Sequence, residues 1–135
     1  MWYDSTIDAC SSVEAVIYSA VLNVTFDCHD PGAVAQFWSA VTGYAVEKVS
    51  APGNEYWVAS PPDDAWPRLV FVKVPEPKVV KNRVHLDVLP AARDQDREVE
   101  RLLGLGATIV DDRRELTPGG WVVLADPEGN EFCVE

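Results

Sequence analysis

The same order of predicted elements, a strand, a helix and three strands, occurs twice along this chain. The elements of the first half span 20–28, 31–42, 44–50, 55–60 and 68–74, and those of the second half span 82–89, 94–105, 107–112, 121–126 and 131–135. A single unit of this kind leaves one sheet face that it cannot cover alone. The repeat therefore predicts that the two halves pack together.

Local signals define the first helix and strand of the repeat. Asp30 is a favourable N-cap, Pro31 suits the first helical position, and Gly43 is a typical stop. In the strand at 20–28, Leu22, Val24 and Phe26 alternate with polar residues, which indicates one core face and one polar face.

At 135 residues the chain is long enough for one domain, and the matched halves run from about 20 to 75 and from about 82 to 135. Residues 1–19 precede this single domain at 20–135 and are expected to form an extension, with or without a short helix at 12–18.

Charge and composition narrow the functional classes. The net charge is −11, and the basic residues form no stripe, so a nucleic-acid partner is not expected. No long apolar run or secretory signal is present, which predicts a cytoplasmic protein without a membrane partner. Three widely spaced cysteines indicate no disulfide framework, and no GxSxG, Walker-type, GxGxxG or CxxC motif occurs.

The stretch VHLDV at 84–88 carries the main candidate residues. In a strand, His85 and Asp87 share one face with Arg83, while Val84, Leu86 and Val88 take the other. By the same alternation, the polar faces of the first and last strands are expected to lie near this one. They carry Asn23, Thr25 and Asp27 in the first strand, and Glu131, Cys133 and Glu135 in the last.

The chemistry of these side chains leaves several interpretations open. A divalent metal needs three or four converging ligands, and only His85 and Cys133, helped by Asp87 or Glu135, qualify. His85 could equally act as a general acid or base, bind an anion, or be a hydrogen-bonded strand histidine. Cys133 could simply be a small buried apolar residue. Trp57 and Trp121 are either packed aromatics or walls of a ligand cleft.

Four segments resemble a known family: FDCHDPGAVAQFWSAVTGY, VPEPKVVKNRVHLDV, LLGLGAT and ADPEGNEFCVE. Together they are similar to the glyoxalase-like branch of the vicinal oxygen chelate superfamily, which includes glyoxalase I, bleomycin resistance proteins and extradiol dioxygenases. The resemblance implies an α+β fold of two paired βαβββ modules. Their curled mixed sheets would form a cup, with the helices packed on the outer face.

The resemblance also implies where a metal would bind in this fold. The four ligand positions of metal-using relatives fall on Asn23, on His85, near Val72 and on Cys133, and only His85 keeps a usual ligand. A complete metal site and any other cofactor are therefore not expected, because a valine and an asparagine cannot replace two strong ligands.

The leading prediction is a small-molecule-binding protein of the glyoxalase and bleomycin resistance type, with a homodimer as the expected assembly. The predicted ligand-binding residues are Asn23, Thr25, Trp57, Val72, His85, Asp87, Trp121, Cys133 and Glu135. One alternative is a lyase, isomerase or dioxygenase-like enzyme that uses His85 as metal ligand or general acid/base. Another is an interaction module whose cup is filled by side chains.

Overall fold

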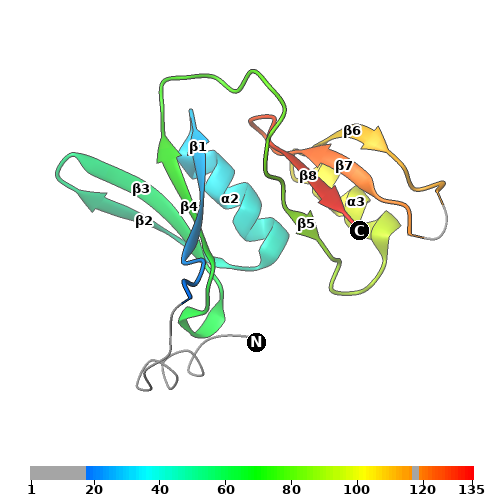
Figure 1. Cartoon of the computed structure of the whole chain (residues 1–135), viewed down its shortest axis with the longest axis horizontal. Helices are drawn as coiled ribbons and strands as arrows, with labels where there is room; N and C mark the ends of the chain where they lie inside the picture. Colours follow the sequence, from blue (N-terminus) through cyan, green and yellow to red (C-terminus); the bar gives the residue numbers. More distant parts are fainter. Residues whose placement is uncertain (1–17, 117–118) are drawn as a thin grey trace.

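The chain forms two βαβββ modules that pack around one helix (Figure 1). The computed structural model describes residues 18–116 and 119–135. The predicted helix at 12–18, apart from Tyr18, and most of the predicted extension lie outside these residues. Within them, neither helix is long and apolar enough to cross a membrane.

Both predicted modules are confirmed in the order of their elements. The first contains β1 (Asn23–Cys28), α2 (Pro31–Thr42), β2 (Ala45–Ala51), β3 (Asn54–Ser60), a short 3-10 turn η1 (Pro62–Asp64) and β4 (Arg68–Lys73). The second contains β5 (Asp87–Val88), α3 (Gln95–Gly104), β6 (Thr108–Asp112), β7 (Val122–Ala125) and β8 (Glu131–Val134).

The two sheets have equivalent topologies. Their strand orders are β1-β4-β3-β2 and β5-β8-β7-β6. In each sheet the first strand pairs in parallel with the last strand of its module, and the remaining pairs are antiparallel. The first strand of each module therefore lies at an edge of its sheet. The α+β class and the mixed sheets expected from the sequence are confirmed.

Helix α2 begins and ends at its predicted signals. The Asp30 carboxylate accepts a hydrogen bond from the backbone N–H of Ala33 at 3.2 Å. Gly43 adopts a left-handed conformation with φ of 77°, and its N–H donates to the carbonyl of Ser39 at 2.8 Å. This geometry closes the last turn and favours glycine because it has no Cβ.

The core joins the two modules through α2. The Trp38 indole of α2 is 1% exposed and lies 5.4 Å from the ring of Phe26 in β1 and 4.9 Å from that of Phe132 in β8, between ring centroids. Its Nε1 donates to the buried carboxylate of Asp126 at 3.0 Å. A single apolar core thus contains residues of both sheets, and α2 lies between the sheets (Figure 1).

The strand predicted at 82–89 is shorter than expected, since only Asp87 and Val88 form β5. Upstream, the backbone N–H of Asn82 donates to the side chain of Glu131 at 2.9 Å and not to a neighbouring strand. Val84 is 77% exposed. The hydrogen bond of Asn82 to a side chain thus takes the place of regular strand pairing at the start of this segment. Closer to β5, the N–H of Cys133 still donates to the carbonyl of Leu86 at 2.9 Å.

Candidate functional site

The register of β5 and β8 places Asp87 and Cys133 on one face of the second sheet, and His85 precedes β5 by two residues. Leu86 and Val88 pack against the core, so the alternating residues His85 and Asp87 face away from it. Asp87 lies opposite Cys133 in the parallel pair of β5 and β8. The predicted sharing of a face by residues of β5 and β8 therefore has a direct basis in the strand pairing.

A hollow of about 320 Å³ lies on this outward face. Five of the nine predicted ligand-binding residues line it, and they come from three neighbouring strands or the segments that flank them. The complete lining consists of Lys81, His85, Asp87, Trp121, Val123, Glu131, Cys133 and Glu135. We refer to it as the outer hollow.

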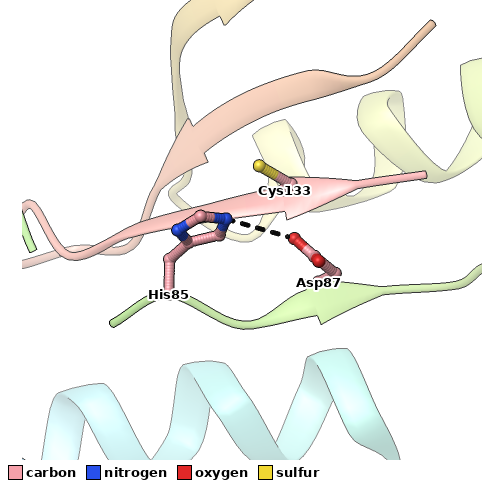
Figure 2. Close-up of side chains that lie close together, drawn as sticks. All are labelled: His85, Asp87 and Cys133. Atoms are coloured by element: carbon pink, nitrogen blue, oxygen red, sulfur yellow. Dashed lines mark ion pairs between the residues drawn. The ribbon is translucent and has the colours of Figure 1, made fainter. Parts of the chain in front are cut away.

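Three side chains in the outer hollow lie close together, as Figure 2 shows. The Nε2 atom of His85 is 3.4 Å from Oδ1 of Asp87, and these two side chains are 41% and 56% exposed. Cys133 is buried, at 7% exposure. Across the described residues, donor atoms of His85, Asp87 and Cys133 lie within 4.8 Å of one another.

Acidic groups dominate the electrostatics of the outer hollow. Burial raises the pKa of the Cys133 thiol, and the negative charges of Asp87 and Glu135 raise it further, against a smaller opposing effect of Lys81. Burial and the two carboxylates disfavour a thiolate in the free protein. The hollow therefore favours positive charge over negative charge.

Glu131 has a different role in the same hollow. Burial acts to raise the pKa of its carboxyl group, but hydrogen bonds from the Asn82 backbone and the Lys78 ammonium outweigh burial and lower the pKa. Lys78 Nζ lies 3.1 Å from Oε1 of Glu131. Glu131 is thus neutralised by Lys78, whereas Asp87 and Glu135 remain the acidic groups that face the Cys133 thiol.

The predicted residues of the first module lie on a separate face. Asn23, Thr25 and Val72 occupy the face of their sheet that α2 does not cover, since the alternating residues Val24 and Phe26 pack into the core. Asn23 Oδ1 accepts a hydrogen bond from Arg68 Nε at 3.0 Å.

Asn23, Thr25 and Val72 therefore lie outside the outer hollow, whose lining comes from residues 81–135 alone. The reason is the packing of α2 between the sheets, where Phe37 and Trp38 contact Phe132. Polar residues on both first strands are left pointing away from α2.

Thr25 and His85 both line a cavity between the modules, together with Asp27 and Arg83 from the same two polar faces. This cavity has a volume of about 570 Å³ and is lined by β1, by residues 82–86 and by the turn before β8. Phe26, Trp38 and Phe132 contribute apolar surface to it. Of the nine predicted ligand-binding residues, only Thr25 and His85 line this cavity.

Trp57 lies away from the other predicted residues. It is paired in register with Phe71, which is a core residue, so it takes the helix-facing side of β3. Its ring also lies against Gly32 of α2, where an added Cβ would come within 3.1 Å of the indole. The differing placement follows because β3 is apolar on both faces, and its sequence does not distinguish them.

The outer hollow also contains residues that were not predicted as ligand-binding. Val123 lies two residues after Trp121, and Glu131 two before Cys133, so strand alternation could have identified both. Lys81 comes from the irregular segment before β5. No local pattern marks its position.

The residues do not fit the four-ligand metal site of metal-using relatives. Of the four positions, Val72 has no donor atom and Asn23 Oδ1 is bonded to Arg68. Both lie in the first module, apart from His85 and Cys133. A divalent ion bound in the family pattern would therefore lack two of its ligands.

Comparisons with known proteins agree with the βαβββ architecture. A structure of the fosfomycin resistance protein FosX from Mesorhizobium loti is 17% identical, with a TM-score of 0.64 over 88% of this chain and 92% of that one. FosX from Listeria monocytogenes, in complex with Mn(II) and 1S,2S-dihydroxypropylphosphonic acid, is 12% identical, with a TM-score of 0.69 over 88% and 93%.

A glyoxalase/bleomycin resistance protein/dioxygenase family enzyme from Burkholderia phytofirmans PsJN is 19% identical, with a TM-score of 0.62 over 86% of this chain and 97% of that one. No curated protein matches the sequence. At these identities the structural similarities establish the fold alone. A sequence model described as a glyoxalase-like domain matches residues 23–135. The chain therefore belongs to the glyoxalase-like domain family of the vicinal oxygen chelate superfamily.

Proposed function

We propose that this chain is a small-molecule-binding protein whose ligand occupies the outer hollow. The observation that carries the proposal is the convergence of five predicted residues on one hollow of about 320 Å³. This volume lies at the lower end of the roughly 300 to 1,000 Å³ of typical ligand sites. Trp121 and Val123 offer apolar surface, and His85 and Asp87 offer polar groups beside it.

The charge of the outer hollow defines the class of ligand. Asp87 and Glu135 share the hollow with one unpaired basic residue of its lining, Lys81, while Glu131 is already paired with Lys78. An anionic ligand would add negative charge to a site with an acidic excess. We therefore propose a neutral or cationic molecule with a flat apolar part. A ring or an amine can lie on the exposed indole of Trp121.

Metal-free protein gives the direct test of this proposal. After treatment with a chelator, it is titrated with three sets of aromatic compounds of equal ring size: amines, alcohols and carboxylates. Ligand at 100 times its dissociation constant stabilises the native state by about 2.7 kcal/mol, which is readily seen as a rise in Tm. We expect amines and alcohols to raise the Tm and carboxylates to leave it unchanged.

Two variants locate the binding. Trp121→Ala removes the apolar wall and should abolish the stabilisation, whereas Asp27→Asn alters a carboxylate on the polar face of the first sheet and should preserve it. The proposal is wrong if no compound stabilises the wild-type protein. It is also wrong if the stabilisation is the same in Trp121→Ala as in the wild type.

We further propose that two copies of the chain associate. β1 and β5 are edge strands, and each has one side without a strand partner in the described residues. Such edges favour pairing with another chain. In a homodimer, the Thr25 face of one copy could lie beside the His85 face of the other, as in clefts formed between two subunits of bleomycin resistance proteins. Sedimentation equilibrium of the full chain tests this, and a monomer at all concentrations would contradict it.

A further inference from the structure

Three potential metal ligands of different chemistry converge in the outer hollow. An imidazole nitrogen, a carboxylate oxygen and a sulfur, from His85, Asp87 and Cys133, lie within 4.8 Å of one another. Two of the residues face each other directly across the paired strands β5 and β8. The sheet therefore holds Asp87 and Cys133 in place, and His85 precedes β5 by two residues (Figure 2).

The spacing is compatible with a tetrahedral ion. Ligand distances of about 2.0 to 2.3 Å from Zn²⁺ place neighbouring ligand atoms roughly 3.3 to 3.8 Å apart. His85 Nε2 and Asp87 Oδ1 already lie 3.4 Å apart. Since both side chains are about half exposed, small rotations can bring them closer to the sulfur of Cys133, which is buried and fixed in position.

The donor set selects among ions. A thiolate is a soft ligand and imidazole a borderline one, so the pair favours Zn²⁺ over Mg²⁺, Ca²⁺ or Mn²⁺. On binding, the thiol of Cys133 loses its proton to the solvent, and the resulting thiolate forms the sulfur–metal bond. The carboxylate of Asp87 and this thiolate together balance the two positive charges of the ion.

We propose that His85, Asp87 and Cys133 bind one Zn²⁺ ion, with the fourth coordination position open toward the outer hollow. The donor set differs from the family pattern, because the first module supplies none of the ligands and Asp87 takes part. Three protein ligands and one open position are characteristic of zinc sites that bind a further molecule. The metal site does not depend on the proposed organic ligand, since the three side chains suffice to hold the ion.

Cobalt(II) provides a spectroscopic test that is independent of any activity. It replaces Zn²⁺ at tetrahedral sites, and a bound thiolate gives a sulfur-to-cobalt charge-transfer band in the near ultraviolet. The experiment uses the full chain with Cys10→Ser, so that Cys28 and Cys133 are its thiols. We expect one equivalent of Co²⁺ to produce the band, Zn²⁺ to remove it by displacement, and excess Mn²⁺ to leave it unchanged.

Single substitutions then assign the ligands. Cys133→Ser should abolish the band, and His85→Gln and Asp87→Asn should each weaken Co²⁺ binding by more than roughly 100-fold. That loss exceeds the roughly 10- to 100-fold effect of removing a group that only supports a ligand. Cys28→Ala and Asp27→Asn are matched controls from the first module, one for the thiol and one for the carboxylate, and both should bind Co²⁺ as the parent does.

Several results would overturn the proposal. Absence of the band would show that the three side chains hold no metal ion and that His85 and Asp87, 3.4 Å apart, only pair with each other. A band that survives Cys133→Ser would assign the thiolate elsewhere. Circular dichroism of each variant checks that the fold is intact. Because the compound titrations use metal-free protein, failure of the metal site and failure of small-molecule binding are separate outcomes.

Discussion

The indole of Trp38 links the two modules, and its replacement offers a quantitative test of how they are joined. In Trp38→Phe, the aromatic contacts to Phe26 and Phe132 are largely retained, but the hydrogen bond from Nε1 to Asp126 at 3.0 Å is lost. Hydrogen bonds to charged groups contribute about 1.5 to 3 kcal/mol. The lower end applies because Asn130 Nδ2 still donates to the same carboxylate oxygen at 2.9 Å.

The smaller phenyl ring adds a second cost. It leaves a cavity at a site that is 1% exposed, and a cavity of at least methyl size costs about 1 kcal/mol. We therefore expect Trp38→Phe to lower the free energy of unfolding by about 2.5 kcal/mol. This is a large share of the roughly 5 to 15 kcal/mol that stabilises a typical domain.

Urea unfolding followed by circular dichroism measures this loss without relying on tryptophan fluorescence. Trp121→Phe is the matched control, because its indole is 37% exposed and surface substitutions usually change stability by less than about 0.5 kcal/mol. Combining Trp38→Phe with Asp126→Asn should give a coupling of at least about 0.5 kcal/mol. A loss below about 1 kcal/mol, or strict additivity in the double variant, would refute the role of this bond.

Three further predictions concern single side chains and glycines. Glu131→Gln loses the charged contact with Lys78 and should therefore lower the free energy of unfolding by about 1.5 to 3 kcal/mol. Urea unfolding measures this loss, and an unchanged midpoint of the urea transition would contradict it. Burial raises the pKa of Cys28 to about 12, so its contribution to stability is complete below pH 9 and declines as the pH rises toward 12. The stability advantage of wild type over Cys28→Ala should therefore fall by about 1 kcal/mol between pH 9 and 10, and a constant difference would count against it. Gly43→Ala should destabilise the protein by about 1 kcal/mol, because residue 43 adopts a left-handed conformation. Gly104 lies in α3 with open space around it, so Gly104→Ala should stabilise the protein by up to about 1 kcal/mol. Equal changes in Tm for the two variants would exclude the conformational explanation.

Much of the fold was predictable because its signals are local. Asp30 and Gly43 bound α2 through hydrogen bonds made within a few residues. Alternation alone placed His85 and Asp87 opposite the core-facing Leu86 and Val88. These interactions depend on sequence neighbours, so the sequence contains the necessary information.

The features that escaped prediction depend on contacts between distant segments. The sequence shows that Trp38 and Phe132 are apolar, but not that they meet and place α2 between the two sheets. The irregular path before β5 depends on Glu131, 49 residues beyond Asn82. The position of Lys81 in the outer hollow follows from that path. The face of the sheet on which Trp57 lies was not predictable for a related reason. Both faces of its strand are apolar, and only the pairing with Phe71 determines which face Trp57 takes.

The first strands of the two βαβββ modules carry different side-chain chemistry on their equivalent faces. In the first copy, the amide of Asn23 is engaged by Arg68, and Val72 and Val70 make the adjoining strand apolar on the same face. In the second copy, the equivalent face carries the ionisable groups of His85, Asp87 and Cys133. A duplicated module can keep one copy as scaffold while the other diverges in chemistry. Substitutions on this face can therefore change the chemistry of the second module without disturbing the core contacts of Leu86 and Val88 behind it.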